Sequence, residues 1–400
     1  MRLFRALLLF AALSSAVAAL APAVNALPIF AQRYGGSCRR CHGPFPRLTE
    51  AGEAFAANGF RRHGEEPRDT IRTSDDLLVL GRSLPLSVRF ESNVTWQGGD
   101  GYSPRTDFQT PYALKLISSA ALSKDLSYYF YFYFFEHGEV GVEDAFVQWN
   151  DLGGKPFDLV VGQFQVSDPL FKRELRLELE DYAIYRARVG DTRADLTYDR
   201  GVLATWSPSR FDFAVAAVNG TGKREADDGE RFDTDAPKNV LGRVSFTPSL
   251  GMRVGGMAFG GWEDGTNGDG VVRADVRMAG VDATLSRGAL ELNGQWIRRK
   301  DRHATFEADT PEATTDGGFV EAIWAPAESR WYGYGLWNRM KCDQPLLDAR
   351  LGGPANLTQY QTWNAGAGYL LQRNVRLQGE AGWDTEAEAA RLAFTFVTAF

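Results

Sequence analysis

Long segments of alternating apolar and polar residues are the feature that most constrains how this chain folds. From Leu84 to Trp96, one set of alternate residues is mainly apolar and includes Phe90, whereas the other is polar and includes Arg89 and Glu91. A period of two predicts an extended strand with one apolar and one polar face. In a soluble sandwich the apolar face would form the core. In a transmembrane barrel it would face lipid, and the polar face would line the lumen.

The connections between such segments distinguish the two folds. Short turns are predicted at residues 123–125, 207–210, 247–250, 286–288, 326–329 and 372–374, and longer polar loops at residues 97–107, 220–237, 263–270, 300–317 and 341–356. This alternation of lengths is typical of outer-membrane barrels, in which short turns face the periplasm. The final segment, Arg391 to Phe400, also alternates and ends in an aromatic residue. We therefore predict an all-β fold, a transmembrane antiparallel barrel of about 16 strands over residues 77–400.

The stretch from Gln165 to Gly190 departs from the alternation. Between Lys172 and Asp181, charged residues of both signs are too dense for a strand that faces lipid. We therefore predict a connection that folds into the lumen or over its mouth, where both signs of charge would narrow the pore. The alternative is an ordinary solvated loop.

Residues 1–26 have the pattern of a cleavable export signal. Arg2 and Arg5 precede an apolar stretch from Leu7 to Leu20, and Val24-Asn25-Ala26 offers small residues for cleavage before Leu27. No later stretch approaches the roughly 18 consecutive apolar residues of a transmembrane helix. Together with the barrel pattern, the signal predicts export to the outer membrane of a Gram-negative cell and contact with its lipid.

Charge and cysteine content exclude two further classes. The whole chain has a formal charge of −7, and removal of a leader with two Arg leaves −9, so nucleic acid is not an expected partner. Of the three Cys, two lie in one short motif, so no disulfide framework is implied. The third, Cys342, has no predicted role.

The motif Cys38-Arg39-Arg40-Cys41-His42 carries specific chemistry. Two thiols three residues apart can form thioethers to the vinyl groups of one haem, and the following His can then ligate the iron. A thioredoxin-like redox pair and half of a zinc site are the alternatives, but neither requires the His, and there is no second C-x-x-C. We predict one covalently bound haem c, attached to Cys38 and Cys41, with His42 as the proximal ligand.

Residues 27–76 form the predicted haem segment, which is too short for a large independent core. Within it, Leu48 to Asn58 is expected to be helical, with Thr49 as the N-cap and Asn58-Gly59 as the stop. Four apolar side chains could cover the porphyrin faces: Phe45, Leu48, Phe55 and Phe60. Such a segment is expected to act as a plug or cap of the barrel.

The sequence leaves the sixth iron ligand open. After the leader there is no Met before Met252, so no methionine ligand is near. His63 is the other His of the haem segment and the candidate distal ligand. His137 and His303 are weaker candidates, because they fall at a strand end and in a long loop. An iron without a sixth ligand would instead bind small ligands, which is a separate class of function.

The haem segment resembles a known family. Before the motif stands Leu27 to Gly35, and after it stand Phe45-Pro46-Arg47-Leu48, Gly52-Glu53-Ala54-Phe55 and Asn58-Gly59-Phe60. This segment is similar, over about 35 residues, to fused outer-membrane monohaem cytochrome c–porins, whose best-known members oxidise ferrous iron at the cell surface. Over the barrel the similarity is architectural. The resemblance implies that Cys38, Cys41 and His42 hold the haem and that electrons cross the outer membrane through this chain.

We therefore expect an electron-transfer protein and a candidate Fe(II) oxidase. Extracellular Fe(II) would give an electron to the haem near the outer loops, and a periplasmic carrier, a cytochrome c or a cupredoxin, would collect it. Carboxylates suit a hard divalent ion, and the candidates are Glu178, Glu180, Asp181, Asp227, Asp228 and Glu230. The alternative function is a diffusion porin whose haem segment is a plug or a redox gate.

Overall fold

The structure is a computed structural model. It describes residues 29–62, 70–71, 74–75, 80–81, 85–99, 102–136, 139–268, 270–350, 356–372 and 374–399. The predicted leader and the predicted boundary between the haem segment and the barrel, at residue 76, lie outside these ranges.

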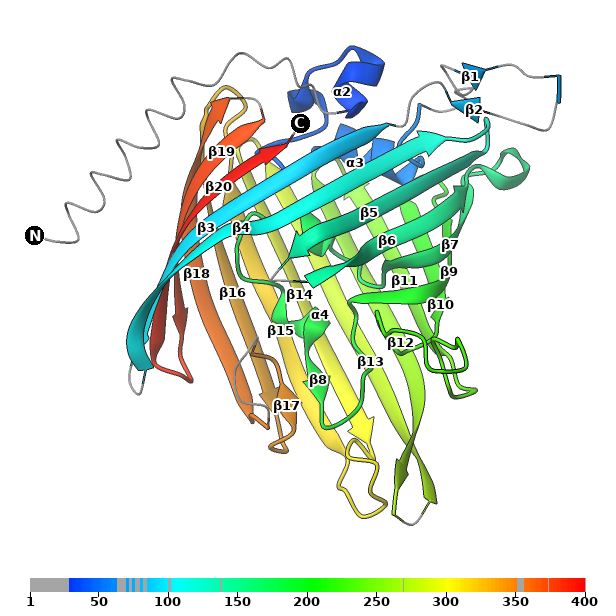
Figure 1. Ribbon diagram of the computed structural model, residues 1–400, viewed down its shortest axis with the longest axis vertical. Coiled ribbons are helices and arrows are strands. Elements are labelled where there is room, and N and C mark those ends of the chain that lie inside the picture. Colours follow the sequence, from blue (N-terminus) through cyan, green and yellow to red (C-terminus); the bar gives the residue numbers. More distant parts are fainter. Residues whose placement is uncertain are drawn as a thin grey trace, which may run out of the picture.

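Within the described residues, sixteen antiparallel strands close into one barrel (Figure 1). These strands are β3 (Leu86–Gly99), β4 (Tyr102–Ala121), β5 (Leu126–Glu136), β6 (Glu139–Trp149), β7 (Phe157–Gln165), β9 (Tyr198–Trp206), β10 (Phe211–Val218), β11 (Asn239–Ser249), β12 (Met252–Asn267), β13 (Gly270–Arg287), β14 (Leu290–Arg302), β15 (Ala313–Trp324), β16 (Trp331–Cys342), β18 (Gln359–Gln372), β19 (Val375–Asp384) and β20 (Ala389–Ala399). The barrel closes where β20 pairs with β3, with Ala399 opposite Arg89. The predicted fold class is confirmed.

The polar face of the strands lies inside the barrel. On β3, Arg89 is 8% exposed and Asn93 is fully buried, whereas Leu86 and Trp96 on the other face are exposed. A soluble sandwich would show the reverse burial, because its polar face meets water. The outward apolar residues are suited to lipid, and the inward polar ones line the lumen.

Short and long connections alternate as predicted, but two predicted loops are mainly strand and a third is shortened. Residues 97–107 and 263–270, predicted to be loops, belong mainly to β3, β4 and β12, and the strands end in tight hairpins near Gly99 and Asn267. The prediction was wrong because these strands continue past their apolar stretch, where polar residues occupy both faces and the period of two fades. The predicted loop 220–237 is observed at residues 219–238. The predicted loop 300–317 is shorter, residues 303–312, because its two ends belong to β14 and β15. Both loops lie at the same end as these hairpins, as do the described residues 343–350, which follow β16 (Figure 1).

Short helices form the described part of the N-terminal segment. They are α2 (Ile29–Tyr34), the 3-10 turn η1 (Cys38–Arg40) and α3 (Glu50–Ala57), followed by the strand pair β1 (Thr70–Ile71) and β2 (Leu80–Gly81). As predicted, Thr49 caps α3, and its side chain accepts a hydrogen bond of 3.3 Å from the Gly52 amide. No helix among the described residues is long and apolar enough to cross a membrane.

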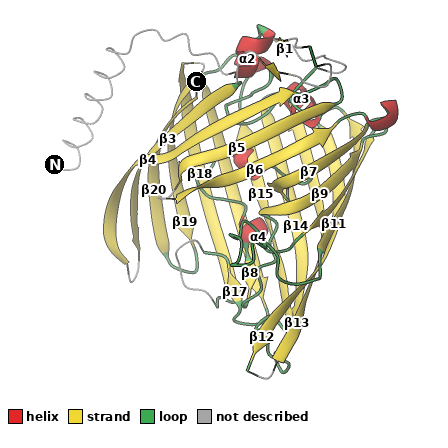
Figure 2. Ribbon diagram, turned by 45° about the vertical axis from the view of Figure 1, so that its right-hand side comes forward, coloured by secondary structure: helices red, strands yellow, loops and turns green. Residues whose placement is uncertain are grey.

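The N-terminal segment is docked on the barrel end where the short turns gather (Figures 1 and 2). Arg47 forms ion pairs with Glu291 and with Glu321 on the barrel wall. The Gln148 side chain donates a 2.9 Å hydrogen bond to the Ala57 carbonyl at the end of α3. Arg39 pairs at 3.9 Å with a residue of the β15–β16 turn, Glu328. By the usual orientation of such barrels, this end faces the periplasm.

The lumen is occupied by residues 166–197, which we call the luminal plug. The plug joins β7 to β9 and contains the 3-10 turn η3 (Arg173–Leu175), the helix α4 (Ala183–Arg186) and the strand β8 (Arg188–Val189). Near the long loops, β8 pairs with the short strand β17 (Leu347–Asp348). A further 3-10 turn, η2 (Leu152–Gly154), lies between β6 and β7. The predicted folding of residues 165–190 into the lumen is confirmed.

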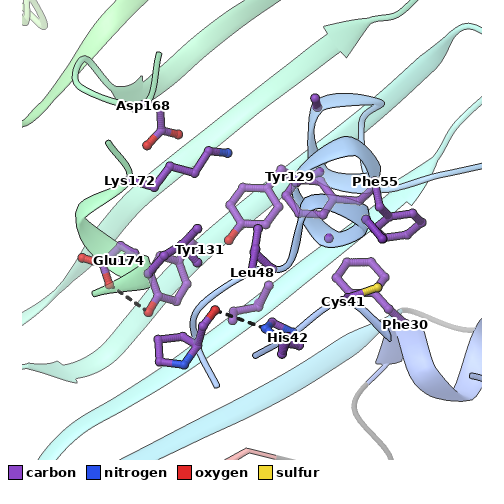
Figure 3. A pocket seen from close by; sticks show the side chains of 18 of the residues that line it. Phe30, Cys41, His42, Leu48, Phe55, Tyr129, Tyr131, Asp168, Lys172 and Glu174 are labelled. Carbon is purple, nitrogen blue, oxygen red and sulfur yellow. Dashed lines mark hydrogen bonds between the residues drawn. The ribbon is translucent and has the colours of Figure 1, made fainter. Parts of the chain in front are cut away.

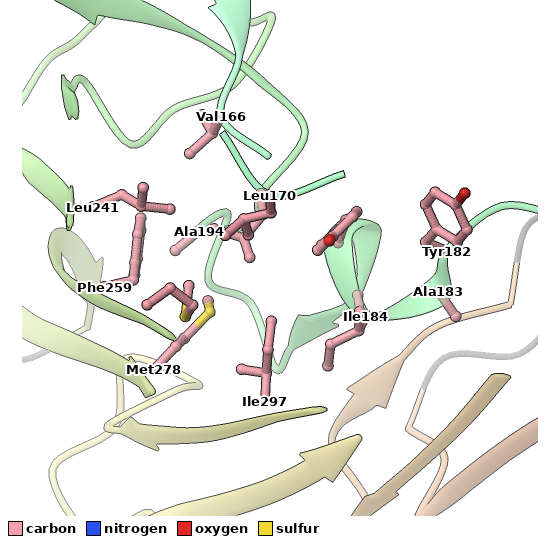
Figure 4. Close-up of a cluster of buried hydrophobic side chains, with 14 of the residues drawn as sticks. Val166, Leu170, Tyr182, Ala183, Ile184, Ala194, Leu241, Phe259, Met278 and Ile297 are labelled. Carbon is pink, nitrogen blue, oxygen red and sulfur yellow. The ribbon is translucent and has the colours of Figure 1, made fainter. Parts of the chain in front are cut away.

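An apolar core fixes the plug to the wall (Figure 4). Side chains of the plug pack on inward-facing residues of β11 to β16, and this core includes Leu170, Ala183, Ile184, Leu241, Phe259, Met278 and Ile297. The Tyr182 ring stacks on Phe319 with a centroid distance of 4.2 Å. Aliphatic and aromatic packing of this kind is unusual for a water-filled lumen, and it makes the plug an integral part of the fold.

Glu321 joins the three parts of the molecule. Its side chain is completely buried on β15. It accepts hydrogen bonds from Tyr182 of the plug at 2.6 Å and from Asn293 of the wall at 2.7 Å. Arg47 of the N-terminal segment lies 3.5 Å away. A buried carboxylate is stable only with such partners.

Replacement of Gly59 by Ala tests the docking of the N-terminal segment. Gly59 has a φ of +65°, and a Cβ there would lie 2.2 Å from Ser127 Oγ and 2.6 Å from Asn150 Oδ1. A non-glycine residue in this backbone region costs on the order of 1–3 kcal/mol. We expect faster amide hydrogen exchange across residues 29–62 in Gly59→Ala. Gly43→Ala is the control, because its Cβ would meet nothing within 4 Å, and equal exchange in both variants would contradict the docking.

Candidate haem site

The C-x-x-C-H motif forms one tight turn. The Cys41 and His42 amides donate hydrogen bonds to the Cys38 carbonyl, at 3.2 and 2.8 Å. Side chains three residues apart in a 3-10 turn eclipse each other, so both thiols face the same side. Both are free and half-buried.

This turn lines a cavity of about 820 Å³ between the N-terminal segment and the lumen. Cys38, Cys41 and His42 all contribute to its lining. The size is within the roughly 300–1,000 Å³ of typical ligand and cofactor sites. The two attachment residues and the iron ligand predicted from sequence therefore face one common space.

Aromatic side chains form much of the cavity wall. Phe30 stacks on Phe60 at 5.5 Å, and Phe60 stacks in turn on Tyr129 of β5 at 4.6 Å. Phe55 meets Phe30 edge to face at 5.3 Å. The four predicted apolar residues all line the cavity: Phe45, Leu48, Phe55 and Phe60. Such a lining suits a large planar apolar group.

The His42 ring is oriented by its own chain. Its Nδ1 lies 3.1 Å from the Pro46 carbonyl oxygen, and this contact is drawn in Figure 3. Burial lowers the pKa of His42 below its ordinary value of 6.5, which favours the neutral ring. A neutral ring that donates Nδ1–H to a carbonyl keeps the Nε2 lone pair for a metal, which is the usual arrangement of a ligating His.

These observations fit a haem c. The cavity supplies two thiols on one side of a turn, an oriented neutral imidazole and aromatic walls. Burial raises the pKa of the Cys41 thiol above its ordinary value. Cys38, Cys41 and His42 would hold the group.

The cavity floor is made by the luminal plug and by β5 and β6. Three residues of the plug lie on the floor side of the cavity in Figure 3: Asp168, Lys172 and Glu174. On the opposite side lie His42 and Cys41. The Tyr131 hydroxyl donates a 3.3 Å hydrogen bond to Glu174. These floor residues were not predicted from the sequence. The dense charge of residues 172–181 was the available signal, but it did not indicate which of these charged side chains face the motif.

Glu174 and Lys115 anchor the floor to the wall. Lys115 of β4 is buried and forms ion pairs with Glu136 at 2.8 Å, and with Glu143 and Glu174 at 3.2 Å each. The Lys115 charge, despite burial, lowers the pKa of Glu174, so this plug carboxylate stays ionised. The floor is therefore held by charge as well as by packing.

The cavity opens at the short-turn end. Ser207, Arg330 and Asn374, which lie in or beside short turns, line it. The sequence-based expectation that Fe(II) meets the haem near the outer loops does not fit this position of the motif. The luminal plug stands between the cavity and the long loops.

The predicted acidic residues are not brought together. In the luminal plug, Asp181 pairs with Arg173 of the same segment. Glu180 of the plug pairs at 3.2 Å with Arg391 of β20 on the barrel wall. Asp227, in the loop between β10 and β11, pairs at 2.9 Å with Arg231. The other candidates are Glu178, buried in the plug, and the exposed loop residues Asp228 and Glu230. Across the part of the chain that the structure describes, no three His, Cys, Asp or Glu residues are placed to hold a metal.

Two of the candidate distal ligands, His63 and His137, lie outside the described residues, and His63 stays a prediction. His303 lies in the β14–β15 loop, with Nδ1 3.3 Å from the Glu307 carbonyl, and does not line the cavity. Cys342 is buried in the apolar core of the lumen.

A scan against protein-family models finds no match, and no curated protein matches either. Solved structures do match. An anion-selective porin from Comamonas acidovorans aligns over 80% of this chain and 99% of its own, with a TM-score of 0.57 and 11% identity. The outer membrane channel DcaP of Acinetobacter baumannii aligns over 80% of this chain and 97% of its own, with a TM-score of 0.54 and 11% identity.

A third match is the trimer form of OmpT from Vibrio cholerae. It covers 79% of this chain and 99% of its own, with a TM-score of 0.54 and 10% identity. At such identities the likeness concerns the fold alone. This chain has the fold of the outer-membrane porins, with a lumen that its own plug fills.

Proposed function

We propose that this chain is an outer-membrane cytochrome that carries one haem c in the periplasmic mouth of a porin-like barrel and transfers electrons across the membrane. The observation that carries the proposal is the shared cavity of Cys38, Cys41 and His42 at the short-turn end of the barrel. A bound haem supplies one-electron chemistry. The chain supplies attachment, an oriented imidazole and walls that exclude water.

The position of the cavity supports delivery to a periplasmic carrier. A soluble cytochrome c or cupredoxin could approach the short-turn face directly, since the exposed motif residues Arg39 and Arg40 lie at its surface. The donor is proposed to be extracellular Fe(II), which makes the chain an iron oxidase. Its electron would have to pass the luminal plug, because the plug separates the long loops from the cavity.

Membership of the fused cytochrome c–porin family is part of the same proposal. Two independent observations support it: the similarity of the haem-segment sequence and the porin fold of the remaining chain. Neither observation identifies the donor. The proposal therefore needs separate tests of haem attachment and of electron transfer.

The three cysteines permit a sharp test of haem attachment. We expect Cys38→Ala and Cys41→Ala each to lose one thioether, which shifts the α-band of the pyridine haemochrome, and the double variant to lose covalent haem. His42→Ala should retain the covalently attached haem, as measured by the protein mass, but should change the haem absorption bands that report the axial ligand. Cys342→Ala is the matched control, because Cys342 lies in the lumen core away from the cavity. Full haem attachment in the double variant would refute the site.

Electron transfer from iron is tested in sealed outer-membrane vesicles that contain the oxidised protein. After rapid mixing with external Fe(II), we expect the haem absorbance to change from the oxidised to the reduced spectrum on the time scale of the rapid-mixing record. Vesicles with the Cys38→Ala, Cys41→Ala double variant are the control for haem-independent change. If dithionite reduces the haem but external Fe(II) does not, the iron-oxidase part of the proposal fails.

A diffusion porin is the second candidate function, and the porin fold is the observation that favours it. Planar-bilayer recording separates the two functions. We expect a conductance far below that of the Comamonas acidovorans porin measured in the same bilayers, since the plug fills the lumen with packed side chains. A conductance equal to that porin would favour diffusion over electron transfer.

A further inference from the structure

We propose that one corner of the cavity floor binds a hard divalent cation through Asp144, Gln165 and Asp168. These residues come from β6, from the end of β7 and from the start of the luminal plug, and all three line the cavity. None of them belongs to the haem motif. The proposed site therefore lies across the cavity from Cys41 and His42 (Figure 3).

Asp144 is the first observation. It faces the lumen on β6, opposite Tyr131 of β5, and is only 6% exposed. Its Oδ1 is buried and has no hydrogen-bond partner among the described residues. A buried ionised carboxylate without a partner is strongly unfavourable, so this oxygen requires a countercharge or a proton.

Gln165 is a second and independent observation, because it is not acidic. It is 1% exposed, and its Nε2 donates a 3.2 Å hydrogen bond to Asp168 Oδ1. Its own Oε1 is buried without a partner in the described part of the chain. The amide therefore holds one carboxylate with its donor end and leaves an oxygen lone pair unused beside it.

Asp168 completes the set from the side of the plug. Of the charged groups around Asp144, Asp168 exerts the strongest effect on it, and the two carboxylates repel each other. Burial raises the pKa of Asp168. Lys172 attracts both carboxylates, and Arg173 also attracts Asp168. A divalent ion between the two carboxylates would relieve their mutual repulsion.

The donor set selects the class of ion. Carboxylate and amide oxygens suit hard cations such as Mg²⁺, Mn²⁺ and Fe²⁺, and Mg²⁺-like sites commonly use one or two carboxylates with the rest water. Soft metals prefer sulfur ligands, which this corner lacks.

This inference deepens the proposed function. The role of the bound ion rests on that function, whereas the binding of the ion does not. If a haem occupies the cavity, an ion held at Asp144 and Asp168 would lie next to it, on the short-turn side of the luminal plug. The binding itself needs no haem. It can therefore be measured with a cation that does not react.

The experiment is a titration of the full-length haem-loaded protein in detergent with Mn²⁺, followed by the loss of the sharp EPR signal of free Mn²⁺. We expect Asp144→Asn and Asp168→Asn each to weaken binding at least about tenfold, which equals about 1.4 kcal/mol. Gln165→Glu adds a carboxylate to the same corner and should tighten binding. These substitutions are nearly isosteric, so the barrel should remain folded.

Asp227→Asn is the matched control, because Asp227 is an acidic residue of an outer loop that pairs with Arg231. It should leave the Mn²⁺ affinity unchanged. Equal affinity in the wild type, Asp144→Asn and Gln165→Glu proteins would overturn the site. So would an absence of Mn²⁺ binding in the wild type, which would mean that Lys172 or a proton neutralises the corner.

The result is separable from the test of electron transfer. Mn²⁺ binding without haem reduction by Fe(II) would keep the cation site and reject iron as donor. Haem reduction without Mn²⁺ binding would keep the proposed function and reject this site.

Discussion

A buried carboxylate on the barrel wall, Glu321, holds the three parts of this protein in one arrangement. Its partners come from the N-terminal segment, the luminal plug and a neighbouring strand: Arg47, Tyr182 and Asn293. Removal of one partner of a buried ion pair typically costs about 3–5 kcal/mol. Because each part supplies a partner to the same buried carboxylate, movement of any one part would remove an ion pair or a hydrogen bond from it. The cavity lined by Cys38, Cys41 and His42 lies between the segment and the plug, so its shape depends on this shared contact.

The barrel could be predicted from sequence because its determinants are local. A period of two fixes which residues face lipid, and turn residues mark where strands end. The two errors, at residues 97–107 and 263–270, have the same origin: beyond the apolar band, a strand carries polar residues on both faces and reads as a loop. The hydrogen bonds of the sheet continue there, although the hydrophobic signal does not.

The site was only partly accessible from sequence, because its second half is built by distant residues. The motif itself, the helix after it and the aromatic side chains Phe45, Phe55 and Phe60 were all predictable from a short segment. The cavity floor was not. Glu174 meets Lys115 across 59 positions of sequence, and Arg47 meets Glu291 across 244. Which charges of the plug face the motif depends on how the plug enters the lumen, and no local pattern records that.

The cavity also implies an order of events in the making of the protein. It is lined by Phe30, close to the start of the described chain, and by Ala399, at the end of β20. Its enclosure is complete only when β20 pairs with β3. A group held by shape alone would therefore have no site until the barrel closes. Thioether bonds to Cys38 and Cys41, as proposed for a haem c, would need only a five-residue stretch of chain. Attachment could then precede enclosure, and the closing barrel would surround a group that is already covalently bound.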